Sequence, residues 1–280
     1  MARPHIEFIH AQDLGWQNGV QPDLLSGLDC KVLSMDDENG ACSVILRYPP
    51  GWSQNGPLHL AAAHEFLVLD GAMTLSGQEY LADSYGYLPS GFSHENWTTK
   101  DGAVVLTFFS SRPDCITGPG NMTEDAVPHL YLHEMKWSSA DVDPDLDFLR
   151  IAHKILREDE ESGAKTMILD CGAQSHPQNW KEGALAHPCV EEMFLLSGDI
   201  ITERGVMNAG AYFWRPPNIW HGPFGSRHGN LCVIRFLHGH HVNNWSDEKY
   251  PFSLTPDHKP DLPEQLKEFA DKPFAAPTPY

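Results

Sequence analysis

The sequence predicts an all-β protein made of two tandem barrels of jelly-roll type with few short helices. One observation is an internal repeat, because five landmarks of residues 59–94 recur 127 residues later: His64–Glu65 as Glu191–Glu192, Gly71 as Gly198, Pro89 as Pro216, Gly91 as Asn218 and His94 as His221. The other is a series of short β-rich segments separated by turn signals at roughly 8–12 residue spacing. We therefore interpret the chain as a tandem duplication of one β module.

The length of 280 residues fits two domains of ordinary size. The repeat places an N-terminal domain at residues 1–125, a C-terminal domain at 126–242 and a Pro-rich extension at 243–280. Hydrophobic residues make up 41% of the chain and charged residues 20%, which is typical of a folded globular protein.

The charge and the cysteines restrict the partners and the compartment. A formal net charge of −19 argues against nucleic acid or an anionic membrane, since both require a basic face. The N-terminus lacks a signal-peptide pattern, and no apolar run approaches the ~18–20 residues needed to span a bilayer. The six cysteines show no CxxC spacing and are expected to be reduced. These features predict a cytoplasmic protein.

The first module begins after a lead-in of about 35 residues. Strands are expected at residues 41–48, 66–69, 72–75, 85–88 and 103–109. Asp70–Gly71 is a strong hairpin signal, and Pro89–Gly91 predicts a second turn.

The second module repeats this series after a linker rich in Pro and Gly. Residues 147–157 of the linker are compatible with a short helix, and 156–163 with a charged loop. Strands are then expected at residues 165–170, 193–196, 199–202, 211–215 and 231–237, with a hairpin at Gly198. A short amphipathic helix is plausible at 263–271, followed by an extended tail at 272–280.

The second module also carries two spaced motifs. The first contains Gly183, His187, Glu191 and Gly198, and the second contains Gly210, Pro216, Asn218 and His221. This arrangement resembles the two-part signature of the cupin superfamily, G-x5-H-x-H-x3,4-E-x6-G followed by G-x5-P-x-G-x2-H-x3-N. The first module matches the same signature with His59, His64 and Gly71, then Pro89, Gly91 and His94. The chain is therefore similar to bicupins over residues 40–110 and 163–237.

The ligand geometry of the second module also follows from strand periodicity. Residues i and i+4 of a strand lie on the same face, so His187 and Glu191 point the same way. The turn at Pro216 returns the chain so that His221 can face them. Two imidazoles and one carboxylate leave about three open positions on an octahedral ion, which suits non-heme Fe(II), with Mn(II), Ni(II) and Zn(II) as rivals.

The first module offers a candidate three-histidine site, formed by His59, His64 and His94. Three neutral imidazoles would hold Zn(II) or Fe(II) and leave its full 2+ charge, which favours an anionic substrate. This module departs from the repeat at His59, since adding 127 gives Ala186 rather than His187. A bulge or a loop would be needed for His59 to converge with the other two.

Other polar and aromatic residues near the motifs have structural interpretations. Alternation points Glu65 and Glu192 to the face opposite the ligands. The histidine cluster at 238–241 is expected to be a surface loop. Surface or packing roles are expected for the arginines, with a carboxylate clamp as their rival, and core packing for the tryptophans: Arg47, Arg215, Trp52, Trp97, Trp214 and Trp220.

The cupin resemblance implies several chemistries, because one fold hosts many functions. We favour a non-heme iron dioxygenase that acts on a small enolisable or phenolic substrate, narrowly with the first module as the catalytic one. The sequence leaves open whether one or both modules hold metal. One alternative is a non-redox Zn(II) or Mn(II) lyase, decarboxylase or isomerase, and another is a non-catalytic small-molecule-binding cupin. The resemblance further implies a homodimer. The sequence shows no nucleophile elbow and no phosphate-binding glycine loop.

Overall fold

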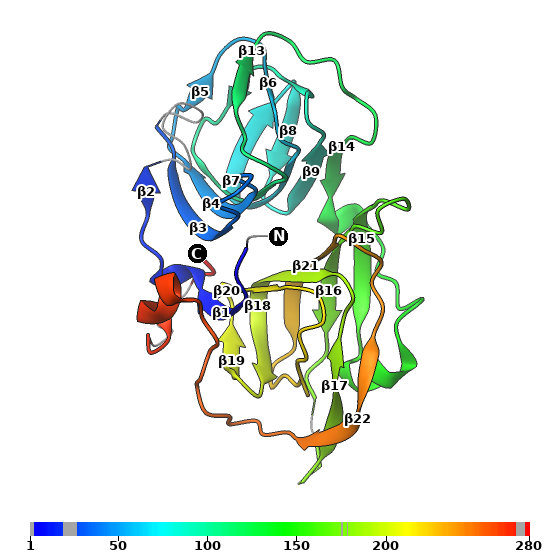
Figure 1. Ribbon diagram of the computed structural model, residues 1–280. Coiled ribbons are helices and arrows are strands. Elements are labelled where there is room, and N and C mark those ends of the chain that lie inside the picture. The colour runs from blue at the N-terminus through cyan, green and yellow to red at the C-terminus, as the bar shows by residue number, and fades with distance from the viewer. Residues whose placement is uncertain (1–2, 19–26, 175, 178, 273–277) are drawn as a thin grey trace. The chain divides into compact units, whose positions relative to one another are not determined.

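Strands dominate the computed structural model, which describes residues 3–18, 27–174, 176–177, 179–272 and 278–280 (Figure 1). The predicted all-β class with few short helices is confirmed. Contacts divide the chain into two units, Met1–Arg3 with Leu14–Lys136 and Pro4–Asp13 with Trp137–Tyr280. Each unit contains one copy of the sequence repeat.

The described elements of the first unit are β2 (Gln17–Asn18), β3 (Asp29–Met35), β4 (Cys42–Tyr48), β5 (Ser53–Gln54), β6 (Leu58–Leu60), β7 (His64–Leu75), β8 (Gln78–Leu81), β9 (Ser84–Leu88), β10 (Ser93–His94), β11 (Trp97–Thr98), β12 (Ala103–Phe109), β13 (Cys115–Thr117), β14 (Val127–Tyr131) and the 3-10 helix η2 (Leu132–Glu134). The main sheet has the order β14-β9-β7-β12-β4-β3-β2, and β10-β6-β13 form a small sheet.

The described elements of the second unit are β1 (Ile6–His10), β15 (Ala152–Glu158), β16 (Lys165–Cys171), β17 (Lys181–Ala186), β18 (Val190–Thr202), β19 (Gly205–Asn208), β20 (Ala211–Arg215), β21 (Asn230–Leu237), β22 (Asn244–Pro251) and the 3-10 helices η1 (Ala11–Asp13), η3 (Pro144–Leu149) and η4 (Glu264–Phe269). The main sheet has the order β1-β20-β18-β21-β16-β15, and β17 pairs with β22.

The two main sheets repeat the same strand order, with β9-β7-β12-β4-β3 matched by β20-β18-β21-β16-β15. The edge strand beside β9 is β14, which follows the first module in sequence. The edge strand beside β20 is β1, which precedes both modules. The N-terminal strand therefore completes the second unit, whereas the predicted boundaries placed it in the N-terminal domain. Likewise β22 of the predicted extension pairs with β17 of the second unit (Figure 1).

The predicted hairpins at Gly71 and Gly198 are wrong, because β7 and β18 run straight through these glycines. Both have positive φ, +73° and +79°. A Cβ on Gly71 would lie 2.2 Å from the carbonyl oxygen of Gly102, and a Cβ on Gly198 would lie 1.9 Å from that of Gly229. The glycines are thus required by close contact with the neighbouring strand, at positions that keep the 127-residue offset.

The helix considered for residues 147–157 is also wrong. Only η3 is helical there, and β15 follows because residues 152–158 pair with β16. The short helix near the C-terminus is confirmed as η4, although it is of the 3-10 type. The predicted tail at 272–280 lies largely outside the described residues. No helix in the described part of the chain is both long and apolar enough to cross a membrane.

Candidate metal centre

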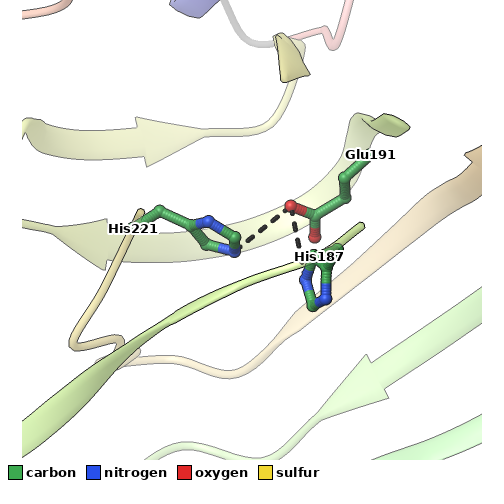
Figure 2. A group of neighbouring side chains, drawn as sticks. All are labelled: His187, Glu191 and His221. Atoms are coloured by element: carbon green, nitrogen blue, oxygen red, sulfur yellow. Dashed lines mark ion pairs between the residues drawn. The ribbon is translucent and has the colours of Figure 1, made fainter. Parts of the chain in front are cut away.

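Three of the predicted ligands meet inside the second unit. His187 follows β17, Glu191 lies near the start of β18, and His221 follows the turn after β20. Backbone hydrogen bonds fix this arrangement, because His221 and Leu185 exchange both bonds at 2.9 and 3.0 Å. The amide of Asn218 also donates to the carbonyl oxygen of His187 at 2.7 Å. Figure 2 shows the three side chains converging from separate segments.

The potential ligand atoms of these residues all lie within 4.8 Å of one another. Glu191 Oε2 is 3.3 Å from His221 Nε2 and 3.8 Å from His187 Nε2. All three residues are at most 6% exposed. The predicted residues His187, Glu191 and His221 therefore meet at one buried point, although His187 lies in the turn between β17 and β18 and not on the same strand as Glu191.

The tautomers of the two imidazoles can be assigned from their hydrogen bonds. His187 Nδ1 lies 3.0 Å from the carbonyl oxygen of Val242, and His221 Nδ1 lies 2.9 Å from that of Ile219. Because a carbonyl can only accept, each Nδ1 carries the proton and each Nε2 presents a lone pair. Burial, with Arg215 nearby, lowers the pKa of His221 to about 4, so its ring is neutral near pH 7.

The facing atoms then form a combination that suits a cation. His221 Nε2 is buried and has no hydrogen-bond partner among the described residues. It lies 3.3 Å from Glu191 Oε2, an acceptor that also receives a hydrogen bond from Arg215. A divalent ion bound by both atoms would satisfy them, and backbone carbonyls orienting metal-binding imidazoles are a common outer-shell arrangement. The residues present thus fit a metal ion.

Glu191 also belongs to a buried ion-pair network with Arg215 and Glu7, referred to as the relay. Arg215 Nη1 donates to Glu191 Oε2 at 2.7 Å, and its Nε donates to Glu7 Oε2 at 2.6 Å. Its Nη2 donates to Glu7 Oε1. Burial alone would raise the pKa of each carboxyl, but the guanidinium overrides it and lowers both values to about 2. The relay therefore holds two anions and one cation.

A cavity of about 640 Å³ opens beside the ligands. Its wall is mainly apolar, with Met193, Ile200, Phe213 and Phe236 among the lining residues. The segment from Asp141 to Leu149, which includes η3, also contributes to the lining. The volume lies in the range of pockets that bind small organic molecules.

His241 is a cavity residue that the sequence interpretation missed. The cluster at 238–241 was expected to be a surface loop, and its three histidines, His238, His240 and His241, are exposed. His241 nevertheless lines the cavity, stacks on Phe236 at 3.8 Å and lies 4.6 Å from the His187 ring, between ring centroids. It has no counterpart in the first module, so the repeat gave no signal for it.

The candidate ligands of the first unit do not converge as a three-histidine group. His64 Nδ1 lies 3.2 Å from His94 Nε2, and His94 Nδ1 lies 2.9 Å from the carbonyl oxygen of Phe92. His94 Nδ1 therefore donates to this carbonyl, and its Nε2 accepts from His64. Burial lowers the pKa of His64 well below its usual value and that of His94 to about 4, so both rings are neutral.

His59 lies on the other face of its strand. Register pairs Leu58 of β6 with His94 and His59 with Ser93. Because directly paired residues share a face and neighbours alternate, His59 and His94 point in opposite directions. His59 Nδ1 is instead 3.2 Å from the carbonyl oxygen of Gly118. The one-residue departure from the repeat therefore removes His59 from the buried pair.

The remaining candidates have structural contacts. Glu65 and Glu192 are buried and accept hydrogen bonds from Tyr85 and Tyr212 at 2.7 and 2.6 Å. Arg47 is half-exposed and pairs with Asp29. Three of the four tryptophans are buried or packed on the core, Trp52, Trp97 and Trp214, while Trp220 is 54% exposed.

Comparisons with known proteins agree with this architecture. A sequence model of the family described as ChrR Cupin-like domain matches residues 5–112 and 132–241. A search of curated proteins found no match. A proposed dioxygenase from Nostoc punctiforme has a similar structure, with 16% identity, a TM-score of 0.73, and coverage of 90% of this chain and 92% of that chain.

Oxalate decarboxylase from Bacillus subtilis is also similar. A deletion mutant of that enzyme gives 12% identity, a TM-score of 0.53, and coverage of 85% of this chain and 79% of that chain. A further structure, described with Mn(II) centres, gives 12% identity and a TM-score of 0.51 over the same shares. At these identities the likeness shows the fold, which is a duplicated cupin.

Proposed function

The chain belongs to the ChrR cupin-like domain family, and from this premise we propose that its second module is a catalytic metal centre. His187, Glu191 and His221 would hold a divalent ion. The observation that carries the proposal is the buried convergence of three potential ligand atoms, with His221 Nε2 lacking a hydrogen-bond partner among the described residues and lying 3.3 Å from Glu191 Oε2. The sequence narrowly favoured the first module, but there His64 and His94 hydrogen-bond to each other, His59 points elsewhere and no carboxylate joins them, although His64 Nε2 also has no partner among the described residues.

The reaction class we propose is oxygenation of a small enolisable or phenolic substrate. Two imidazoles and one carboxylate on one side of an ion are typical of non-heme Fe(II) oxygenases. The bound ion would supply Lewis acidity to the substrate oxygens and a position for O2. The apolar wall formed by Met193, Ile200 and Phe213 would bind the hydrocarbon part of the substrate and exclude water.

The fold likeness to the proposed dioxygenase from Nostoc punctiforme supports this choice without establishing it. A non-redox decarboxylase or lyase with Mn(II) is the second candidate, in view of the Mn(II) centres of oxalate decarboxylase. The iron preference, the homodimer and the cytoplasmic location stay predictions.

The test is metal content and oxygen uptake of untagged protein prepared anaerobically. We expect about one iron per chain in the wild type, loss of this iron in His221→Ala, and retention in the matched first-module variant His94→Ala. Oxygen uptake with a panel of phenols and β-diketones should require the iron. Manganese or zinc without oxygen uptake would support the second candidate, and metal retained in His221→Ala would refute the placement of the centre.

A further inference from the structure

Glu7 reaches the candidate metal centre from the other end of the chain. It lies on β1, the edge strand of the second unit, 208 positions before Arg215. Register pairs Glu7 with Phe213 on β20, and its backbone also exchanges hydrogen bonds with Asp261. Its side chain is only 4% exposed. An acidic side chain buried at this place requires a partner of opposite charge, which is Arg215.

Arg215 is fully committed to the two carboxylates. Its Nη1 contacts Glu191, whereas Nε and Nη2 form a two-point contact with Glu7. The guanidinium also lies 3.7 Å from the ring of Phe213, measured to the centroid. Because each nitrogen already donates to a carboxylate and the side chain is 2% exposed, Arg215 is not available to clamp a substrate carboxylate.

The relay determines the charge around the bound ion. Two carboxylates and one guanidinium leave one negative charge, and the two imidazoles are neutral ligands. With a divalent ion the centre carries a net charge of +1, in a buried place where screening by salt is weak. Without Glu7 the same centre would carry +2. One monoanionic substrate oxygen neutralises the first arrangement, whereas a dianion neutralises the second.

We propose that Glu7 is a positioning and specificity-determining residue, which acts through Arg215 to hold ligand Glu191 and to match the centre to monoanions. This inference rests on the proposed function and deepens it, because it selects an enolate, phenolate or monocarboxylate over a dianion such as oxalate. The two sequence motifs do not assign Glu7 to the centre, since Glu7 lies outside both motifs.

A purely structural role of Glu7 has to be distinguished from the proposed positioning role, and the chain provides a matched control residue. Glu192 is the next residue along β18, is 1% exposed and also pairs with an arginine, Arg235. Its side chain points away from Glu191, because neighbouring strand residues alternate. Glu192→Gln thus removes a buried, arginine-paired carboxylate of the same strand without changing the charge at the centre.

The experiment measures Co(II) affinity of the full chain by competition with a chromophoric chelator, then binding of benzoate and oxalate to the Co(II) form from its visible spectrum. For Glu7→Gln we expect a roughly 10- to 100-fold loss of Co(II) affinity. The ratio of oxalate to benzoate affinity should rise roughly tenfold, because the centre gains one unit of positive charge. Glu192→Gln should leave both quantities unchanged.

Glu7→Asp keeps the charge and controls for misfolding. It should retain wild-type anion preference and most of the Co(II) affinity. Equal values for Glu7→Gln and Glu192→Gln would overturn the inference while leaving the proposed centre intact, and so would a Glu7→Asp variant that behaves like Glu7→Gln. A wild-type protein that binds no Co(II) would instead refute the proposed centre itself.

Discussion

The two modules share one strand order and one repeat, but they fill their interiors differently. In the first module Tyr48, Tyr80 and Trp97 are each at most 2% exposed and form part of the core. Sheet register matches the two tyrosines to Cys171 and Met207 in the second module, and the 127-residue offset matches Trp97 to Phe224. All three of the smaller residues line the cavity. The second module therefore has smaller side chains than the first at these three equivalent positions, where its cavity is open.

The buried polar residues at equivalent positions of the two modules also differ. His64 of the first module corresponds to Glu191 of the second, and His94 corresponds to His221. Two neutral imidazoles can hydrogen bond to each other, and in the first module they do so at 3.2 Å. An imidazole lone pair and a carboxylate cannot, and the corresponding pair of the second module suits a cation at the same place. A single exchange of residue type thus distinguishes a hydrogen-bonded histidine pair from a candidate metal site.

The largest effect should follow from breaking the relay that only the second module has. Arg215→Met leaves Glu7 and Glu191 buried beside each other without a counter-ion. Removing one partner of a buried ion pair typically costs about 3–5 kcal/mol, so we expect a loss of this size in the free energy of unfolding. Urea unfolding with a metal chelator present measures it. A loss below about 1 kcal/mol would show that the relay is not buried as the structure describes.

A reciprocal exchange tests the difference in packing. Tyr48→Cys should destabilise the first module by about 3 kcal/mol, because a fully buried ring leaves a cavity. Cys171→Tyr should cost less than about 1.5 kcal/mol, because the ring enters existing empty volume. The same variant should lose binding of benzoate to the Co(II) form. Equal costs for the two exchanges would contradict the assignment of one filled and one open interior.

The sequence alone predicted the duplicated architecture, since a 127-residue offset and short β-rich segments are local properties of the chain. It also selected His187, Glu191 and His221 from the spacing of two motifs, although His187 lies in the turn between β17 and β18 and alternation along one strand is not what brings it to Glu191. It misread Gly71 and Gly198 as hairpins, since Asp–Gly and Gly at such places favour turns locally. The actual constraint is contact with a carbonyl oxygen more than 30 residues away.

Other features depend on contacts between segments far apart in the sequence, which no local motif indicates. Glu7 enters the second unit because β1 pairs with β20, and nothing in its neighbourhood distinguishes it from a surface residue. His241 has no repeat partner, so its position beside His187 follows only from the path of the chain after β21. His59 was predicted to be a ligand, and its one-residue departure from the offset required a bulge or a loop for it to converge. The regular register of β6 with β10 instead points it away from His94.

The histidine pair of the first module should make stability depend on pH. The pKa of His94 falls from 6.5 to about 4 on folding, mainly because of burial, so the unfolded chain binds a proton first as the pH decreases. Stability from this group is complete above pH 6.5 and is lost as the pH falls toward 4. Between pH 7.5 and 5 we expect a loss of about 2 kcal/mol from His94. The variant His94→Gln should show a smaller pH slope in urea unfolding with chelator, and an identical slope would contradict the neutral, buried ring.

The smallest effect is expected at Arg47, the other arginine for which the sequence allowed a carboxylate clamp. Its side chain is 44% exposed, pairs with Asp29 and lies 4.3 Å from the ring centroid of Trp16. Exposed ion pairs contribute about 0–1 kcal/mol, because solvent screens the charges and two long side chains lose entropy. Arg47→Met should therefore change the free energy of unfolding by less than about 1 kcal/mol and leave Co(II) affinity unchanged. A larger loss of either quantity would mean that burial and charge pairing do not separate the structural roles of the two arginines.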